Sequence, residues 1–96
     1  MHKVIVYSKT LLSVLNQLGE SIDDIKSVAL MDGYLHIQSL HKNVKLICEI
    51  YPKCDSMLYV QKSETWVNAK KLLKEVEEQP IVIQLNNNRA TFIFEY

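Results

Sequence analysis

Apolar residues along this chain follow one pattern twice. In the first stretch, an extended apolar run at residues 4–7 precedes a helix-like stripe, and two alternating segments then flank Asp32-Gly33. We expect the helix to run from Ser8, a good N-cap residue, to Leu18, because Gly19 suits the position just past a helix end. Asp-Gly favours a two-residue hairpin loop, since a type I′ turn needs positive φ at both central positions. The predicted buried stripe of the helix is Leu11, Leu12, Val14, Leu15 and Leu18.

The second stretch repeats this order after an alternating strand at residues 44–51, which Pro52 ends. Residues 57–67 are predicted to form one long strand, kinked at residues 62–64. A second helix, capped by Thr65 or Asn68, should reach about Glu78, and Pro80 stops it. Its predicted inward positions are Ala69, Leu72, Leu73 and Val76. The predicted closing strands are residues 81–85 and 90–95, around a turn at residues 86–88.

The order of these elements predicts an α+β fold. Two tandem β-α-β-β units place two helices on one face of a largely antiparallel sheet, with Leu11, Leu15, Leu72 and Val76 buried between them. The 96 residues suffice for one hydrophobic core and not for two. We therefore expect a single domain spanning residues 1–96.

Composition narrows the functional classes. No apolar run approaches the roughly 20 residues of a membrane span, and the start leads straight into a strand, so a cytoplasmic protein without membrane contact is expected. Lys+Arg and Asp+Glu balance at 11 each, so no global positive field indicates nucleic-acid binding. Lysine accounts for ten of the eleven basic residues, which, with the Asn and Ile usage, favours an AT-rich genome such as that of a phage or a low-GC bacterium.

Catalytic and metal-binding patterns are missing from the sequence. His2, His36 and His41 lack ligand spacing, and Cys48 and Cys54 suit neither a disulfide framework nor a zinc site. With two glycines there is no phosphate loop, and no serine has a nucleophile motif around it. We expect no enzyme, no metal and no cofactor.

Several segments together resemble a domain of the DNA sliding clamps, the family of proliferating cell nuclear antigen and the bacterial DNA polymerase β subunit. They are residues 7–18, 32–40, 58–60, 66–74, 81–85 and 90–95, which cover most of the chain. The resemblance rests on apolar positions and element order. It implies a noncatalytic replication protein whose paired helices line the pore of a six-domain ring. One clamp-like domain would then need a homo-oligomer or another clamp-fold subunit, and the family's domain usually has one more strand after the position of Phe94.

Lysines on the second predicted helix are the candidate DNA contacts. The predicted helix has basic residues near its start, Lys70 and Lys71, and acidic residues near its end, Glu75, Glu77 and Glu78. This order is the inverse of the one that the helix macrodipole prefers. One interpretation is that the lysines are positioned for a polyanion, and the other is an ordinary solvated face. The candidate DNA-binding set is Lys9, Ser13, Asn16, Gln17, Lys70, Lys71 and Lys74.

The last strand is the candidate subunit interface. Thr91, Phe92, Ile93 and Phe94 give one apolar row and one mixed row, as in an edge strand with one buried face. Trp66 is expected to pack the sheet. Two functions stay open: a sliding clamp and processivity factor that meets double-stranded DNA, a polymerase or a clamp loader, and a phage- or mobile-element-encoded module that mimics a clamp domain and inhibits or redirects a host replication or defence protein.

Overall fold

A computed structural model describes residues 2–48, 57–60, 62–86 and 89–94, and it confirms an α+β domain with two helices and antiparallel sheets. Three predicted features, Cys54, the tip of the 86–88 turn and the strand beyond residue 48, lie outside the described residues. The elements are β1 His2–Tyr7, α1 Ser8–Leu18, the 3-10 helix η1 Gly19–Asp24, β2 Ile25–Met31, β3 Tyr34–Ser39, β4 Asn43–Ile47, β5 Met57–Val60, α2 Ser63–Leu73, β6 Pro80–Asn86 and β7 Arg89–Phe94.

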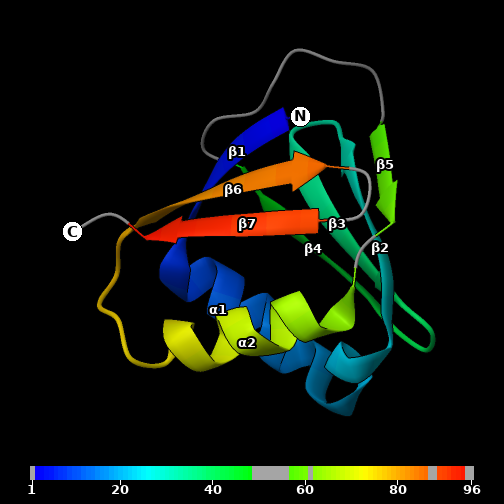
Figure 1. Cartoon of the computed structure of the whole chain (residues 1–96), viewed down its shortest axis with the longest axis horizontal. Helices are drawn as coiled ribbons and strands as arrows, with labels where there is room; N and C mark the ends of the chain where they lie inside the picture. The colour runs from blue at the N-terminus through cyan, green and yellow to red at the C-terminus, as the bar shows by residue number, and fades with distance from the viewer. Residues whose placement is uncertain (1, 49–56, 61, 87–88, 95–96) are drawn as a thin grey trace.

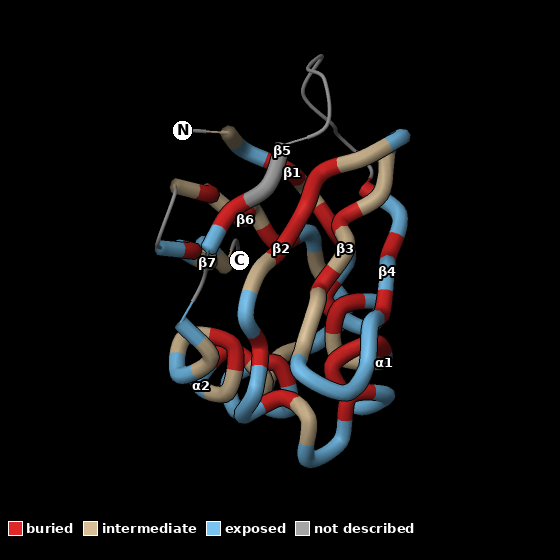
Figure 2. The backbone as a smooth tube through the Cα atoms, turned by 90° about the vertical axis from the view of Figure 1, so that its right-hand side faces the viewer, coloured by how far each residue is buried: buried red, intermediate tan, exposed pale blue. Residues whose placement is uncertain are grey.

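The described strands form two sheets where the sequence suggested one. Their orders are β1-β6-β7 and β4-β3-β2-β5, with every neighbouring pair antiparallel. Figure 2 shows the two sheets above the helices, with β7 over α2 at one side and β4 over α1 at the other. The prediction of a single sheet was wrong. Alternation along a strand shows that one of its faces is buried, but not that a second sheet covers this face, and the apolar stripe of a helix does not show how many sheets pack against it.

The two repeated units exchange their first strands. We call β1, α1, β2 and β3 the first unit and β5, α2, β6 and β7 the second. Strand β1 pairs with β6 of the second unit, placing Val4 opposite Ile83, and β5 pairs with β2 of the first unit, placing Val28 opposite Tyr59. Each unit therefore completes the other's sheet. The exchange also brings α1 and α2 side by side, running in opposite directions (Figure 1).

Backbone conformation confirms the turn and the helix end predicted for the first unit. Asp32 and Gly33 have φ of 54° and 82°, the positive values that a type I′ hairpin loop requires, and Met31 pairs with Tyr34 across them. Gly19, with φ 55°, follows the last residue of α1. The start of α1 differs, because Tyr7 occupies the N-cap position and Ser8 is the first helical residue.

Helix α2 lies earlier in the chain than predicted. It begins at Ser63 and ends at Leu73, so the predicted long strand stops at Val60 and neither Thr65 nor Asn68 caps the helix. Trp66 and Val67, good strand formers by propensity, are helical because this places the Trp66 indole in the core. The buried residues of α2 are Trp66, Ala69 and Leu73.

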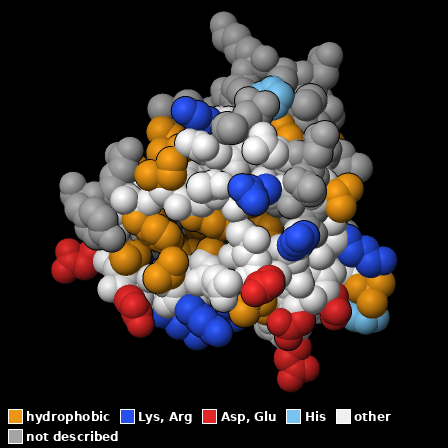
Figure 3. Space-filling model, viewed as in Figure 1, with side chains coloured by type: hydrophobic (Ala, Val, Ile, Leu, Met, Phe, Trp, Pro, Cys, Tyr) orange, Lys and Arg blue, Asp and Glu red, His pale blue; other side chains and the backbone are white. Residues whose placement is uncertain are grey.

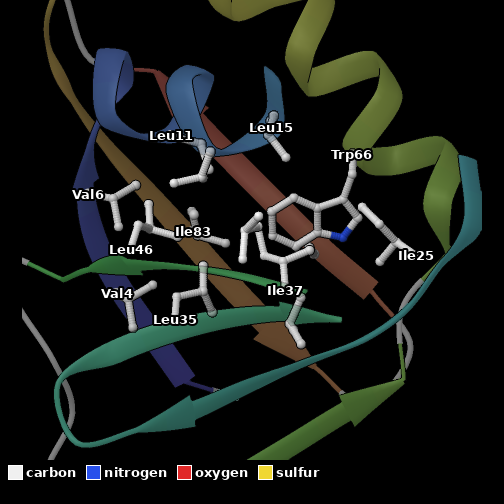
Figure 4. Packing of buried hydrophobic residues seen from close by; sticks show 14 of the residues in the cluster. Val4, Val6, Leu11, Leu15, Ile25, Leu35, Ile37, Leu46, Trp66 and Ile83 are labelled. Carbon is white, nitrogen blue, oxygen red and sulfur yellow. The ribbon is translucent and has the colours of Figure 1, made fainter. Parts of the chain in front are cut away.

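This shift corrects two predicted core positions. Leu72 is 50% exposed, and Val76 lies beyond the helix and is half-buried. Leu11 and Leu15 are fully buried as predicted. The core fills the space between the two sheets, where Val4 and Val6 of one sheet meet Leu35 and Ile37 of the other, and the helices close one side with Leu11, Leu15 and Trp66 (Figure 4).

Candidate DNA-facing surface and assembly edge

The outer side of α1 carries four polar candidates. Lys9, Ser13, Asn16 and Gln17 are all exposed, and together with Leu12 they line a shallow hollow of about 460 Å³. They share this side because Leu11, Val14, Leu15 and Leu18 occupy the opposite stripe, which faces the core. The structure thus places the first-helix candidates together on a solvent-facing surface.

The lysines of α2 occupy its last turn. Lys70 is half-buried, Lys71 is exposed, and Lys74 is exposed just past the helix end. Glu64 stands in the first turn, so the charges agree with the macrodipole and the predicted inversion is wrong. The physical reason is the shifted helix, which leaves Glu75, Glu77 and Glu78 outside it. The lysines therefore need no polyanion to explain their positions, although they remain available to one.

Glu78 has its own structural role at the start of α1. Its Oε1 atom accepts hydrogen bonds from the Lys9 backbone N–H and the Ser8 hydroxyl, each at 3.0 Å. The bond from the Lys9 N–H is the main cause that lowers the pKa of Glu78, and the Ser8 hydroxyl contributes. Ser8 also exchanges hydrogen bonds with Gln79, whose N–H donates to the Ser8 Oγ at 2.9 Å while its carbonyl accepts from the Ser8 N–H at 2.9 Å. A fixed negative charge therefore lies beside Lys9.

The candidate interface residues lie on β7, an edge strand of the three-stranded sheet. Phe92 and Phe94 are half-buried and pack against the core, whereas Thr91 and Ile93 are exposed, Ile93 by 38%. This matches the predicted alternation of one apolar row with one mixed row. Of the described residues, none belongs to a strand that pairs with the outer edge of β7.

Beneath β7 lies a groove that the sequence reading missed. It has a volume of about 310 Å³, and Figure 3 shows apolar side chains gathered between β7 and α2. The lining residues are Thr65, Asn68, Ala69, Leu72, Ala90, Thr91, Phe92 and Phe94, which we call the α2–β7 groove. A prediction that placed Trp66 instead of Leu72 toward the core would have indicated the groove, because residues 65, 68 and 72 then lie on one side of the helix.

Groups with possible chemistry are dispersed across the described residues. No three His, Cys, Asp or Glu side chains among them gather as metal ligands would. His2 contacts the Tyr59 hydroxyl through Nδ1 at 2.5 Å, and burial raises the pKa of the Cys48 thiol to about 11. His36 lies edge-on against Tyr34, and both residues belong to β3.

None of the helices in the described part of the chain has the length and apolar character needed to cross a membrane. Comparison with models of protein families, with curated proteins and with solved structures finds no match. The features of the molecule that bear on function are the fold, the outer side of the helices and the α2–β7 groove.

Proposed function

We propose that this chain is a noncatalytic, clamp-like subunit that assembles edge to edge around double-stranded DNA and serves as a processivity factor. The observation that carries the proposal is the strand exchange between the two units. It sets α1 and α2 side by side at one side of the molecule, while β4 and β7 lie at opposite flanks as sheet edges (Figure 2). Copies joined at these flanks would present all their helices to one side.

The helix surface supplies the contacts in this proposal. Lys9, Lys70, Lys71 and Lys74 carry positive charge, while Ser13, Asn16 and Gln17 offer hydrogen bonds to phosphate oxygens. One copy is neutral overall and Glu78 lies beside Lys9, so a single subunit should bind DNA weakly. Repetition around a ring would sum the local lysine fields. Such contacts are independent of base sequence and weaken steeply as salt rises.

The test combines solution mass with DNA binding. Light scattering should show an assembly, and fluorescence anisotropy should show affinity for duplex DNA that falls steeply between low and moderate salt. Exchanging Lys70, Lys71 and Lys74 for glutamate should abolish binding and leave the mass unchanged. The matched control exchanges Lys3, Lys26 and Lys42, three exposed lysines outside the helices and outside β4 and β7. Absence of binding to linear or circular DNA at low salt, with or without a clamp loader and polymerase, would refute the proposal.

A second function is favoured by the α2–β7 groove together with the zero net charge. In this proposal the chain is a phage- or mobile-element-encoded module that docks on another clamp-fold subunit and inhibits or redirects it. An open apolar groove beside a free strand edge is suited to protein contact. Titration of a purified clamp with this chain should then give a complex in size-exclusion chromatography and slow a clamp-dependent polymerase. A clamp that elutes unchanged argues against it.

A further inference from the structure

The described sheets have four edges, and β7 is the least protected against pairing. Edge strands of monomers usually carry charges or are very short, which prevents other chains from adding to them. Strand β1 carries Lys3, β4 carries Lys45 above the Tyr34 ring, and β5 has four residues. Strand β7 carries Arg89 at its first position and has no charge from residue 90 to residue 94. The middle and the end of its exposed edge therefore lack the usual protection.

The internal repeat marks the space beside β7 as the place of a further strand. Beside the first unit, β4 pairs with β3 and packs on α1, and its Val44 and Leu46 are buried. Strand β7 is the counterpart of β3, and α2 is the counterpart of α1. At the corresponding place in the second unit the described residues leave the α2–β7 groove open, with Leu72 half exposed.

We propose that β7 of a second copy occupies this place, antiparallel to the first β7 and related to it by a twofold axis through Phe92. The register then pairs Ala90 with Phe94 of the other copy and Thr91 with Ile93, so a large side chain meets a small one at both ends.

The groove has a shape that fits its own copy. Helix α2 and strand β7 run in the same direction (Figure 1), so the large lining residues Leu72 and Phe94 come late in their elements and the small ones Thr65 and Ala90 come early. A twofold rotation about Phe92 exchanges the two ends of the groove, bringing the bulky end of one copy against the small end of the other. Self-complementarity of this kind is what an isologous interface requires.

This inference deepens the assembly step of the proposed function and rests on it for its role around DNA. A twofold axis normal to the sheet keeps α2 of both copies on the same side, as a DNA-facing surface needs. In the alternative arrangement, β7 of one copy pairs with β4 of the next, so the copies are joined head to tail and no twofold axis relates them. The two arrangements predict different neighbours for Thr91.

Disulfide trapping distinguishes them. Two single variants, Thr91→Cys and Ile93→Cys, are made in a Cys54→Ser background, and Cys48 is buried. Facing residues of an antiparallel pair lie roughly 4.5–5.5 Å apart between Cα atoms, within reach of a disulfide. Mild oxidation of the mixed variants should give a crosslinked dimer of about twice 11.2 kDa, in several-fold higher yield than either variant alone. The control mixes Thr91→Cys with Lys45→Cys and should give little crosslink.

A second readout avoids engineered cysteines. Leu72→Asp should abolish dimerisation in light scattering, whereas Leu40→Asp, at a residue 53% exposed elsewhere, should leave the dimer intact. Crosslinking of 91 to 45 in preference to 91 to 93, or a wild type that stays monomeric at millimolar concentration, would overturn the twofold dimer. A trapped 91–93 dimer without DNA affinity would keep this inference and refute the proposed function. DNA binding with a 91–45 crosslink would do the reverse.

Discussion

The indole of Trp66 stands edge-on against the ring of Phe92, with centroids 5.0 Å apart and an interplanar angle of 86°. Edge-to-face pairs add about 0.5–1.5 kcal/mol beyond the area they bury. The pair connects α2, which supplies a fully buried indole, to β7, which is a sheet edge. It therefore holds the edge strand on its helix, and Phe92 of this pair also lines the α2–β7 groove.

Neighbouring leucines of α2 should respond differently to truncation. Leu73 is 3% exposed, so Leu73→Ala should cost about 2–5 kcal/mol of unfolding free energy. Leu72 is 50% exposed, so Leu72→Ala should change the stability of the monomer by about 0.5 kcal/mol or less. Urea denaturation followed by circular dichroism measures both. Equal costs for the two variants would refute the helix phase described above.

Trp66 should tolerate phenylalanine far better than alanine. Its Nε1 atom is buried and has no hydrogen-bond partner among the described residues, so Phe removes an unpaired donor while keeping a ring against Phe92. Trp66→Ala should cost about 3–5 kcal/mol, and Trp66→Phe clearly less. Circular dichroism is the suitable measurement, because Trp66 is the sole tryptophan in the sequence. A Phe variant as unstable as the Ala variant would indicate that the indole N–H has a partner.

Glu78 should make stability depend on pH in the acidic range. Its pKa is lowered in the folded state, so the carboxylate stabilises the fold above the ordinary glutamate value, and this contribution is lost as pH falls through the lowered value. Glu78→Gln should therefore reduce the melting temperature at pH 7, and the difference from wild type should disappear in strong acid. Glu75→Gln, at an exposed residue, is the control. A pH-independent difference would exclude the hydrogen bonds to Ser8 and Lys9 as its source.

The Cys48 thiol should react slowly in the folded protein. Burial raises its pKa to about 11, which lowers the thiolate fraction at pH 8 roughly a hundredfold relative to a free cysteine and limits reagent access as well. In a Cys54→Ser variant, labelling by a thiol reagent should be slow in buffer and fast in urea. Rapid labelling without denaturant would contradict the burial of this side chain.

Local signals in the sequence predicted the elements that depend on backbone conformation. Asp32-Gly33 and Gly19 lie where their positive φ was expected, and the α1 stripe faces the core. Helix α2 was misplaced because Trp66 and Val67 prefer strands by propensity, while the burial that overrides this preference comes from distant residues of β7. Lys9, Lys71 and Lys74 are exposed and Lys70 is half-buried, but the electrostatic explanation given for the helix lysines failed with the helix ends. The groove could not be predicted, since it depends on that helix phase.

The exchanged strands also constrain how the chain folds. Strand β1 finds its partner β6 only after nearly the whole chain has been made, since Val4 pairs with Ile83. Neither half can complete a sheet alone, so the local pairs β2–β3, β3–β4 and β6–β7 gain a full core only when the distant pairs form, and closing such long loops is slow. We therefore expect cooperative folding without a stable half-folded state. Separate fragments of residues 1–50 and 51–96 should stay unfolded alone and acquire structure together when mixed.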